Sequence, residues 1–166
     1  MNHEPVLMFE ACLTSQHEAL ERMIAQGQSV NHPLPGQLRL LHIAVSRGDE
    51  IAVTLILAQN PDVDAISSKG ETALYMAATS GNRNIVTLLQ RAHANINLSN
   101  NRGETPLYAA MANRHYECAR LLLWIGALTD IRNIHGLRAE DASPVMDQPS
   151  DLIDLLRAAK MRERRI

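Results

Sequence analysis

Apolar positions along this chain recur with a period of 33 residues, and the copies align without insertion or deletion. A fixed period of tens of residues predicts an array of repeats that stack on one another and share a continuous core. The apolar residues that recur at this spacing are Leu41, Leu74 and Leu107; Ala44, Ala77 and Ala110; and the pairs Leu55 and Ile56, Leu88 and Leu89, and Leu121 and Leu122.

Polar and turn-forming residues recur in the same register and predict the elements of each repeat. Thr72 and Thr105 are good N-caps, because a threonine hydroxyl can accept a hydrogen bond from the first turn of a helix. Pro106 follows at the first helical position, where its missing N–H costs nothing. Gly48 and Gly81 come after these helices, at positions where a left-handed residue reverses the chain. Each repeat is therefore predicted to contain a loop, a helix, a tight turn and a second, antiparallel helix.

The second helices are predicted to end at an equivalent position in each repeat. Gly27 and Gly126 suit a left-handed conformation there, and Asn60 tolerates it. His93 stands at the same position and is expected to carry strain.

Two segments identify the repeat more closely. GETALYMAA, from Gly70 to Ala78, and GETPLYAA, from Gly103 to Ala110, resemble the G-x-T-P-L-H-x-A-A opening of an ankyrin repeat. LLLWIGALTD, from Leu121, resembles its close, and a third copy from Leu40 keeps the family histidine as His42. The resemblance is strong over residues 34 to 132 and weak at both ends. It implies an all-α ankyrin solenoid of stacked helix pairs joined by hairpin-like finger loops, in which His42 ties one finger to the next helix.

The chain is expected to form one domain, residues 1–166, of about five repeats. Residues 1–33 form a diverged N-terminal cap with helices at Val6–Ser15 and Glu18–Gln26. Residues 34–66, 67–99 and 100–132 are the central repeats. Residues 133–166 form a C-terminal cap with a basic tail, in which Ser150 is the expected N-cap of a closing helix.

Composition and charge narrow the function. The chain is 46% hydrophobic with a net charge of −2, which favours a globular protein and argues against nucleic-acid binding. The preferred interpretation of the basic tail is interaction with the negative end of a helix dipole. The tail comprises Arg157, Lys160, Arg162, Arg164 and Arg165.

No enzymatic or metal chemistry is indicated by the residue spacings. The seven histidines form no H-x-x-H or H-x-x-x-H pair, and no phosphate-binding loop, nucleophile elbow or dinucleotide motif is present. Cys12 and Cys118 are expected in the core, without a disulfide, as in a reducing compartment. No signal peptide or membrane-spanning run is found, so a cytoplasmic location without membrane contact is expected.

Binding residues are expected on the finger tips and the exposed side of each first helix, because packing does not fix the side chains there. The charged members of this band are expected to give charge selectivity. The band comprises Arg47, Ser68, Lys69, Glu71, Thr79, Ser80, Asn101, Arg102, Glu104, Ala112 and Asn113.

Several further residues stand apart from that band. Trp124 is either a contact residue or packed under the final helix, and packing is the preferred interpretation. Tyr75 and Tyr108 replace the family histidine and are expected to change its hydrogen bonding. Asn31 and Asn97 match an asparagine that the resemblance makes a candidate for hydroxylation.

The sequence thus favours a non-enzymatic, monomeric module that binds another protein through its concave face and fingers, without cofactor or metal. An effector or inhibitor that regulates a target enzyme is one alternative. An enzyme with a cryptic site is the other.

Overall fold

A computed structural model of the chain describes residues 4–144 and 148–163. All of its regular elements in this part of the chain are helical. The α-helices are α1 (Glu4–Leu13), α2 (His17–Ala25), α3 (Leu40–Ser46), α4 (Glu50–Leu57), α5 (Ala73–Ser80), α6 (Arg83–Arg91), α7 (Pro106–Ala112), α8 (Tyr116–Trp124) and α9 (Ser150–Glu163). Two short 3-10 helices, Pro35–Gln37 (η1) and Ala139–Ala142 (η2), lie between them.

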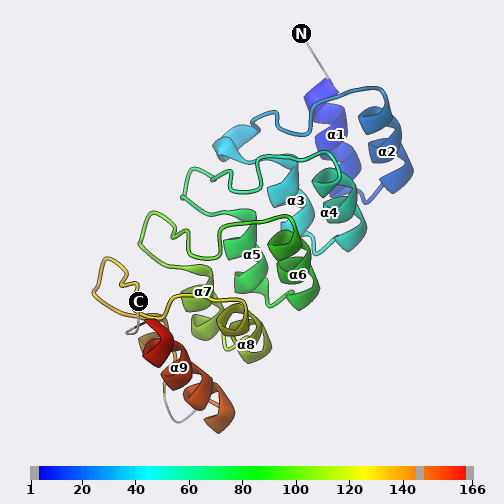
Figure 1. The fold of residues 1–166 in the computed structure, drawn as a ribbon. Helices are drawn as coiled ribbons and strands as arrows, with labels where there is room; N and C mark the ends of the chain where they lie inside the picture. Colours follow the sequence, from blue (N-terminus) through cyan, green and yellow to red (C-terminus); the bar gives the residue numbers. More distant parts are fainter. Residues whose placement is uncertain (1–3, 145–147, 164–166) are drawn as a thin grey trace.

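The helices form pairs that stack side by side along the molecule (Figure 1). The first helices of the pairs, α1, α3, α5 and α7, make one row, and the second helices make a parallel row beside them. The loops between successive pairs project to one side as fingers, beyond the first helices. This arrangement confirms the predicted solenoid of antiparallel helix pairs.

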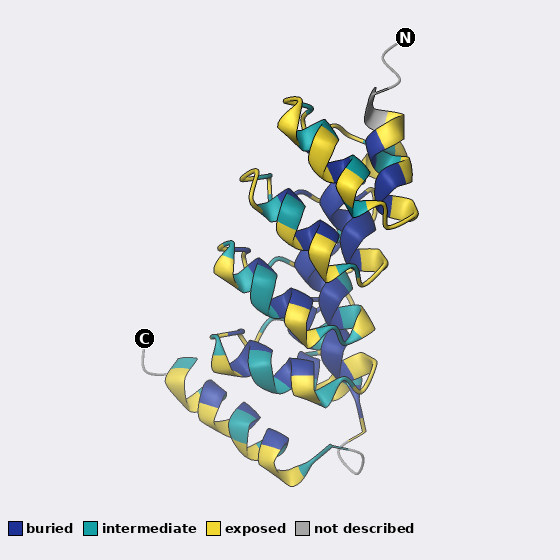
Figure 2. Cartoon of the chain, turned by 90° about the vertical axis from the view of Figure 1, so that its right-hand side faces the viewer, coloured by how far each residue is buried: buried dark blue, intermediate teal, exposed yellow. Residues whose placement is uncertain are grey.

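The core runs through the stack between the two rows of helices, where buried residues of successive repeats follow one another (Figure 2). Ala44, Ala77 and Ala110 are fully buried at equivalent positions on the first helices. Their small side chains let neighbouring helices pack closely, and larger residues such as Leu74 and Leu107 fill the space between layers. Each layer buries its apolar side chains against its neighbours, so stability depends on stacking.

Helix starts follow the predicted caps. The Thr72 hydroxyl accepts a hydrogen bond from the backbone N–H of Tyr75 at 3.1 Å, and the Thr105 hydroxyl accepts one from Tyr108 at 3.2 Å. Pro106 is the first residue of α7. Each satisfied N–H in the first turn stabilises its helix, so these cap predictions are confirmed.

The reversal between paired helices is left-handed, as predicted. Gly81 has a φ of 72° and ends α5. A Cβ built on this glycine would lie 2.5 Å from Nδ1 of His115, so close approach of the next repeat also requires glycine there. After the second helices α4 and α6, Asn60 and His93 adopt positive φ values of 46° and 62°, which confirms the conformation predicted for that position. Arg114 holds the position equivalent to Gly81 and has a φ of 60°, although no glycine marks the reversal there.

The ends of the stack differ from the predictions in detail. Helix α1 lies two residues earlier than the predicted Val6–Ser15, and α2 one residue earlier than Glu18–Gln26. The last repeat opens with only the 3-10 helix η2, and Ser150 is the first residue of α9 rather than its cap. Helix α9 closes the stack through Leu152 and Leu156, which are buried against the core.

The basic tail is partly engaged in ion pairs. Lys160 pairs with Glu140, and Arg157 lies 3.3 Å from Asp154. Arg164 and Arg165 lie outside the described residues.

Within the described part of the chain, no helix combines the length and apolar character that spanning a membrane needs.

Candidate functional site

Hydrogen bonds between backbones join each finger to the next. The N–H of Ser68 donates to the carbonyl of Gly36 at 2.7 Å, and that of Asn101 donates to Lys69 at 3.0 Å. Ile134 donates to Arg102 at 2.9 Å in the same way. The fingers therefore form a continuous ladder, as predicted, which holds the backbone of neighbouring tips together.

Each central finger is also closed by a side chain of its own. Oδ1 of Asn100 accepts hydrogen bonds from the backbone N–H groups of Arg102 at 2.8 Å and Glu104 at 3.0 Å. The Ser67 hydroxyl does the same in the preceding finger, with both distances 3.2 Å. These bonds stabilise the tight turn at each tip and leave little freedom to the backbone there.

His42 links the first helix of its repeat to the following finger. Its Nδ1 accepts a hydrogen bond from the backbone of Arg39 at 3.0 Å, so Nε2 carries the proton and donates to the carbonyl of Glu71 at 3.2 Å. Burial lowers the pKa of His42 and outweighs the effect of the bond to Glu71, so the ring is neutral at neutral pH. The predicted structural role of His42 is confirmed.

Tyr75, which replaces the family histidine one repeat later, makes a different link. Its hydroxyl donates to Oε2 of Glu104 at 2.9 Å. The same oxygen accepts hydrogen bonds from Asn100 and Arg102, each at 2.9 Å. Glu104 is only 8% exposed, so the expectation that it is an exposed residue was wrong. Its carboxylate instead joins two repeats and orients the guanidinium of Arg102.

The ionisation of this cluster follows from its hydrogen bonds. Burial would raise the pKa of Glu104, but the bonds from Asn100, Tyr75 and Arg102 outweigh it and lower the pKa below its usual range. Burial and the adjacent Glu104 raise the pKa of Tyr75 to about 12. At neutral pH the cluster therefore contains an ionised carboxylate and a neutral phenol.

A groove runs along the angle between the fingers and the first helices, with a volume of about 630 Å³. It is lined by most of the helical residues of the predicted band and by several residues that were not predicted to bind. Its walls are formed by Ser46, Glu71, Tyr75, Met76, Thr79, Ser80, Arg102, Glu104, Tyr108, Ala109, Ala112 and Asn113. We call it the inner groove.

A second hollow of about 380 Å³ lies between two finger tips and is called the tip hollow. It shares Glu71 and Arg102 with the inner groove, so the two are contiguous. The residues that form it are Ser68, Lys69, Glu71, Asn100, Asn101 and Arg102. Arg47 lies beside Ser46 and is exposed at the end of α3.

Some groove residues that were not predicted stand at repeat positions equivalent to other residues of the groove. Ser46 is equivalent to Thr79 and Ala112, one and two repeats further on. Met76 and Ala109 are likewise equivalent to each other. Extending the predicted positions to every repeat would have found Ser46, whereas Met76 resembled a core residue by its apolar side chain.

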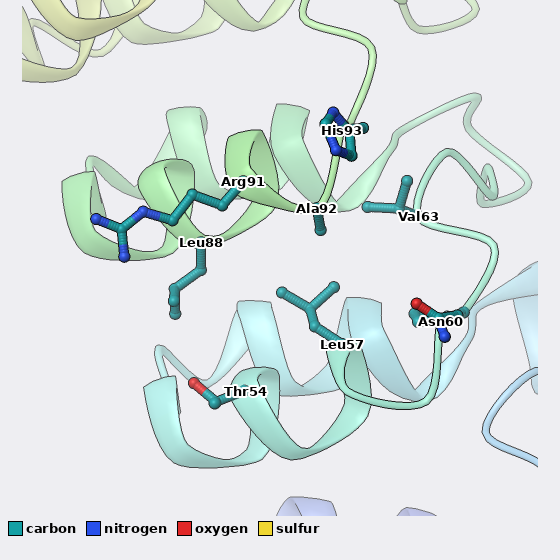
Figure 3. Close-up of a pocket in the computed structure, with 9 residues that line it drawn as sticks. Thr54, Leu57, Asn60, Val63, Leu88, Arg91, Ala92 and His93 are labelled. Carbon is teal, nitrogen blue, oxygen red and sulfur yellow. The ribbon is translucent and has the colours of Figure 1, made fainter.

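Two further hollows lie on the second helices, away from the finger tips. One of about 500 Å³ separates α4 from α6, with Leu57, Leu88 and Val63 around its centre and Arg91 and His93 at its edge (Figure 3).

The other hollow, of about 410 Å³, is bordered by Trp124 together with residues of α6, α8 and α9. Trp124 is 78% exposed, so the preferred interpretation that it packs under the final helix was wrong. Leu152 and Leu156, not this indole, fill the contact with α9.

The two asparagines singled out by the resemblance tie consecutive repeats together. Oδ1 of Asn31 accepts a hydrogen bond from the backbone of Asp62 at 3.1 Å, and Oδ1 of Asn97 accepts one from Leu128 at 2.9 Å. Asp64 does the same for Asn95 at 2.9 Å. These side chains therefore have a structural role at the loop that follows each second helix.

The two cysteines are buried free thiols, as their expected core positions require. Burial raises the pKa of Cys12 to about 12 and also raises that of Cys118, so both are protonated at neutral pH. Among the described residues, no three His, Cys, Asp or Glu side chains are grouped so that they could hold a metal ion.

Helix pairs of this size, with fingers paired in a ladder and an inner groove, define a helical repeat protein built for surface contact. The family model for ankyrin repeats, in three copies, matches residues 41–133. The chain belongs to the ankyrin repeat family, whose repeats are generally modules for protein–protein interaction. A comparison with curated proteins gave no match.

Proposed function

We propose that this chain is a non-enzymatic, monomeric binding module that holds another protein in the inner groove and the tip hollow. The observation that carries the proposal is the contiguity of the two hollows, which share Glu71 and Arg102 and extend from the finger tips onto α5 and α7. A partner segment can contact two central repeats at once along this path.

The rigidity of the site supports the proposal. The backbone ladder between fingers and the Tyr75–Glu104 bond hold the tips and first helices in place without a partner. A surface that is ordered before binding loses little conformational entropy on docking, so modest contacts suffice for useful affinity.

The small, polar side chains of the groove allow close approach. Thr79 is half-buried and Ala112 is exposed at equivalent positions of α5 and α7. Substituting both with glutamine fills the groove without changing the net charge. The Thr79→Gln/Ala112→Gln variant is expected to lose capture of the partner from a lysate of the cells that make this protein.

A matched variant controls for the substitutions themselves. Thr87 on α6 is half-buried and donates its hydroxyl to the carbonyl of Arg83 at 3.0 Å, as Thr79 does to Tyr75 at 2.9 Å. Ala58, just after α4, is exposed like Ala112. Thr87→Gln/Ala58→Gln is expected to capture the same proteins as the unsubstituted chain. Equal capture by all three chains, each with an unchanged melting temperature, would overturn the proposal.

A further inference from the structure

Charge is divided unevenly between the two halves of the central repeats. The segments with finger tips and first helices, residues 34–48, 67–81 and 100–114, contain five basic and two acidic residues. The segments with second helices and the first part of each following loop, residues 49–66, 82–99 and 115–132, contain four basic and six acidic residues. The basic residues of the first set are Arg39, Arg47, Lys69, Arg102 and Arg114, and the acidic ones are Glu71 and Glu104. The finger side, by which we mean these tips and first helices, thus has an excess of basic residues on a chain whose net charge is −2.

Pairing within this set does not remove the imbalance. Glu104 is buried and is bonded to Arg102, Tyr75 and Asn100, so it offsets the charge of one of the five basic residues. Glu71, which is half-buried, is then the one remaining carboxylate in these three segments, all of which lie in the described part of the chain. A face with this excess attracts acidic partners and repels basic ones.

Arg102 combines fixed orientation with exposure. Its Nη2 lies 2.9 Å from Oε2 of Glu104, yet 64% of the side chain is exposed. A guanidinium held by a buried carboxylate is already oriented for a second hydrogen-bonded anion. Lys69 lies across the tip hollow, where Ser68 and Asn101 add neutral polar groups.

The neighbouring part of the inner groove is apolar. Met76 and Tyr108 are half-buried and pack against the core from α5 and α7, and Ala109 and Ala112 lie beside them. Cationic and apolar surfaces therefore adjoin at Arg102. An extended chain places alternate side chains at a spacing that can reach both.

We propose that the partner segment is an extended acidic peptide of a protein. A carboxylate side chain occupies the tip hollow between Lys69 and Arg102, and an aliphatic side chain close to it in sequence packs on Met76 and Tyr108. This assignment rests on the proposed function, because it specifies the chemistry of the segment that the same surface binds.

Two synthetic peptide pools test this assignment on the full chain. Both contain extended peptides of about twelve residues in which two charged residues and two of Leu, Ile, Val or Met follow one another in turn, so that charged and aliphatic side chains alternate along each side of the chain. The charged residues are Asp or Glu in the acidic pool and Lys or Arg in the basic pool. Fluorescence anisotropy of labelled pools is expected to give about tenfold tighter binding for the acidic pool, with affinity falling as salt rises from about 50 to about 200 mM.

Charge reversals locate the binding. Arg47→Glu/Lys69→Glu changes two exposed residues of the finger side and leaves the Arg102–Glu104 pair intact. It is expected to weaken acidic-pool binding by about tenfold, since each exposed ion pair contributes up to about 1 kcal/mol. Arg83→Glu/Arg91→Glu makes the same change of net charge with two exposed residues of α6 and is expected to shift binding by less than about twofold.

Each result bears on the assignment. Equal or tighter binding of the basic pool, equal loss in both reversal variants, or no binding of the acidic pool up to about 1 mM would overturn it. Duplex DNA that binds more tightly than the acidic pool would show that the cations recognise nucleic acid instead. If the groove-filling variant loses a captured protein that the charge reversals do not release, the proposed function stands and the acidic partner is wrong.

Discussion

The hydroxyl of Tyr75 donates a hydrogen bond of 2.9 Å to Oε2 of Glu104, which belongs to the next repeat. This bond replaces the link that His42 makes one repeat earlier, where an imidazole reaches the backbone carbonyl of Glu71 at 3.2 Å. The substitution thus exchanges a neutral contact for one to a charged group. Glu104 in turn orients Arg102, so Tyr75 acts through Glu104 on a residue of the proposed binding surface.

Removing the phenol hydroxyl tests the energetic value of this link. Tyr75→Phe is expected to lower the free energy of unfolding by about 1.5–3 kcal/mol, because a buried carboxylate loses one of its hydrogen bonds. Urea denaturation provides the measurement. Tyr108→Phe is the matched control, since position 137, one repeat after Glu104, is a leucine. A smaller loss at Tyr75 than at Tyr108 would contradict this role.

Acid should weaken the same link. The pKa of Glu104 is lowered in the folded chain, so its ionised form contributes stability at neutral pH. That contribution is lost as pH falls from the unfolded value of about 4.3 through the folded pKa. Wild-type stability should therefore approach that of Glu104→Gln as the pH is lowered from 7 through this range. A constant difference between the two chains in urea melts at each pH would contradict the prediction.

A cap that the sequence lacks can be restored. Arg39 precedes α3 at the position of Thr72 and Thr105, and its side chain cannot accept a hydrogen bond from the first turn. Arg39→Thr is expected to raise the free energy of unfolding by about 0.5–1 kcal/mol. Arg47→Thr, at the other end of α3, should change it by less than about 0.5 kcal/mol. Thermal melts that rank the two variants in the opposite order would refute the cap interpretation.

Glycine is required after α5 for two reasons, its φ of 72° and the proximity of His115. Gly81→Ala is expected to cost about 2 kcal/mol or more, because it combines left-handed strain with a steric clash. Gly27 has a φ of 82° but nothing within 4 Å of a Cβ built there. Gly27→Ala should therefore show only the backbone cost of about 1 kcal/mol, as measured by urea denaturation. Equal costs at the two positions would show that the approach of His115 is unimportant.

The thiols should be unreactive while the chain is folded. Cys12 and Cys118 are buried, and burial raises the pKa of Cys12 to about 12, so its thiolate fraction at pH 8 is about 10⁻⁴. Labelling with a thiol-specific disulfide reagent at pH 8 should follow the unfolding rate, and both cysteines should react at once in urea. Rapid labelling of either cysteine in the native chain would contradict their place in the core.

Much of the architecture was predictable because each repeat encodes it locally. The caps at Thr72 and Thr105 and the reversal at Gly81 act within a few residues of themselves, so one sequence suffices to recognise them. The link between His42 and the next finger was implied by the resemblance to ankyrin repeats.

Features that depend on contacts between repeats were harder to predict. Glu104 looked like an exposed loop residue, and its burial follows from a partner 29 residues away. The exposure of Trp124 depends on how far α9 covers α8, which no local signal specifies. Arg114 adopts a φ of 60° because the register of the stack requires a reversal there, whatever residue is present.

The most direct test of the central proposal is an amide chemical-shift map of the full, isotopically labelled chain with its captured partner. Binding in the inner groove and tip hollow predicts shifts concentrated in residues 67–81 and 100–113, and their loss in the Thr79→Gln/Ala112→Gln variant. Shifts confined to α2, α4, α6 and α8, with the finger amides unchanged, would contradict it.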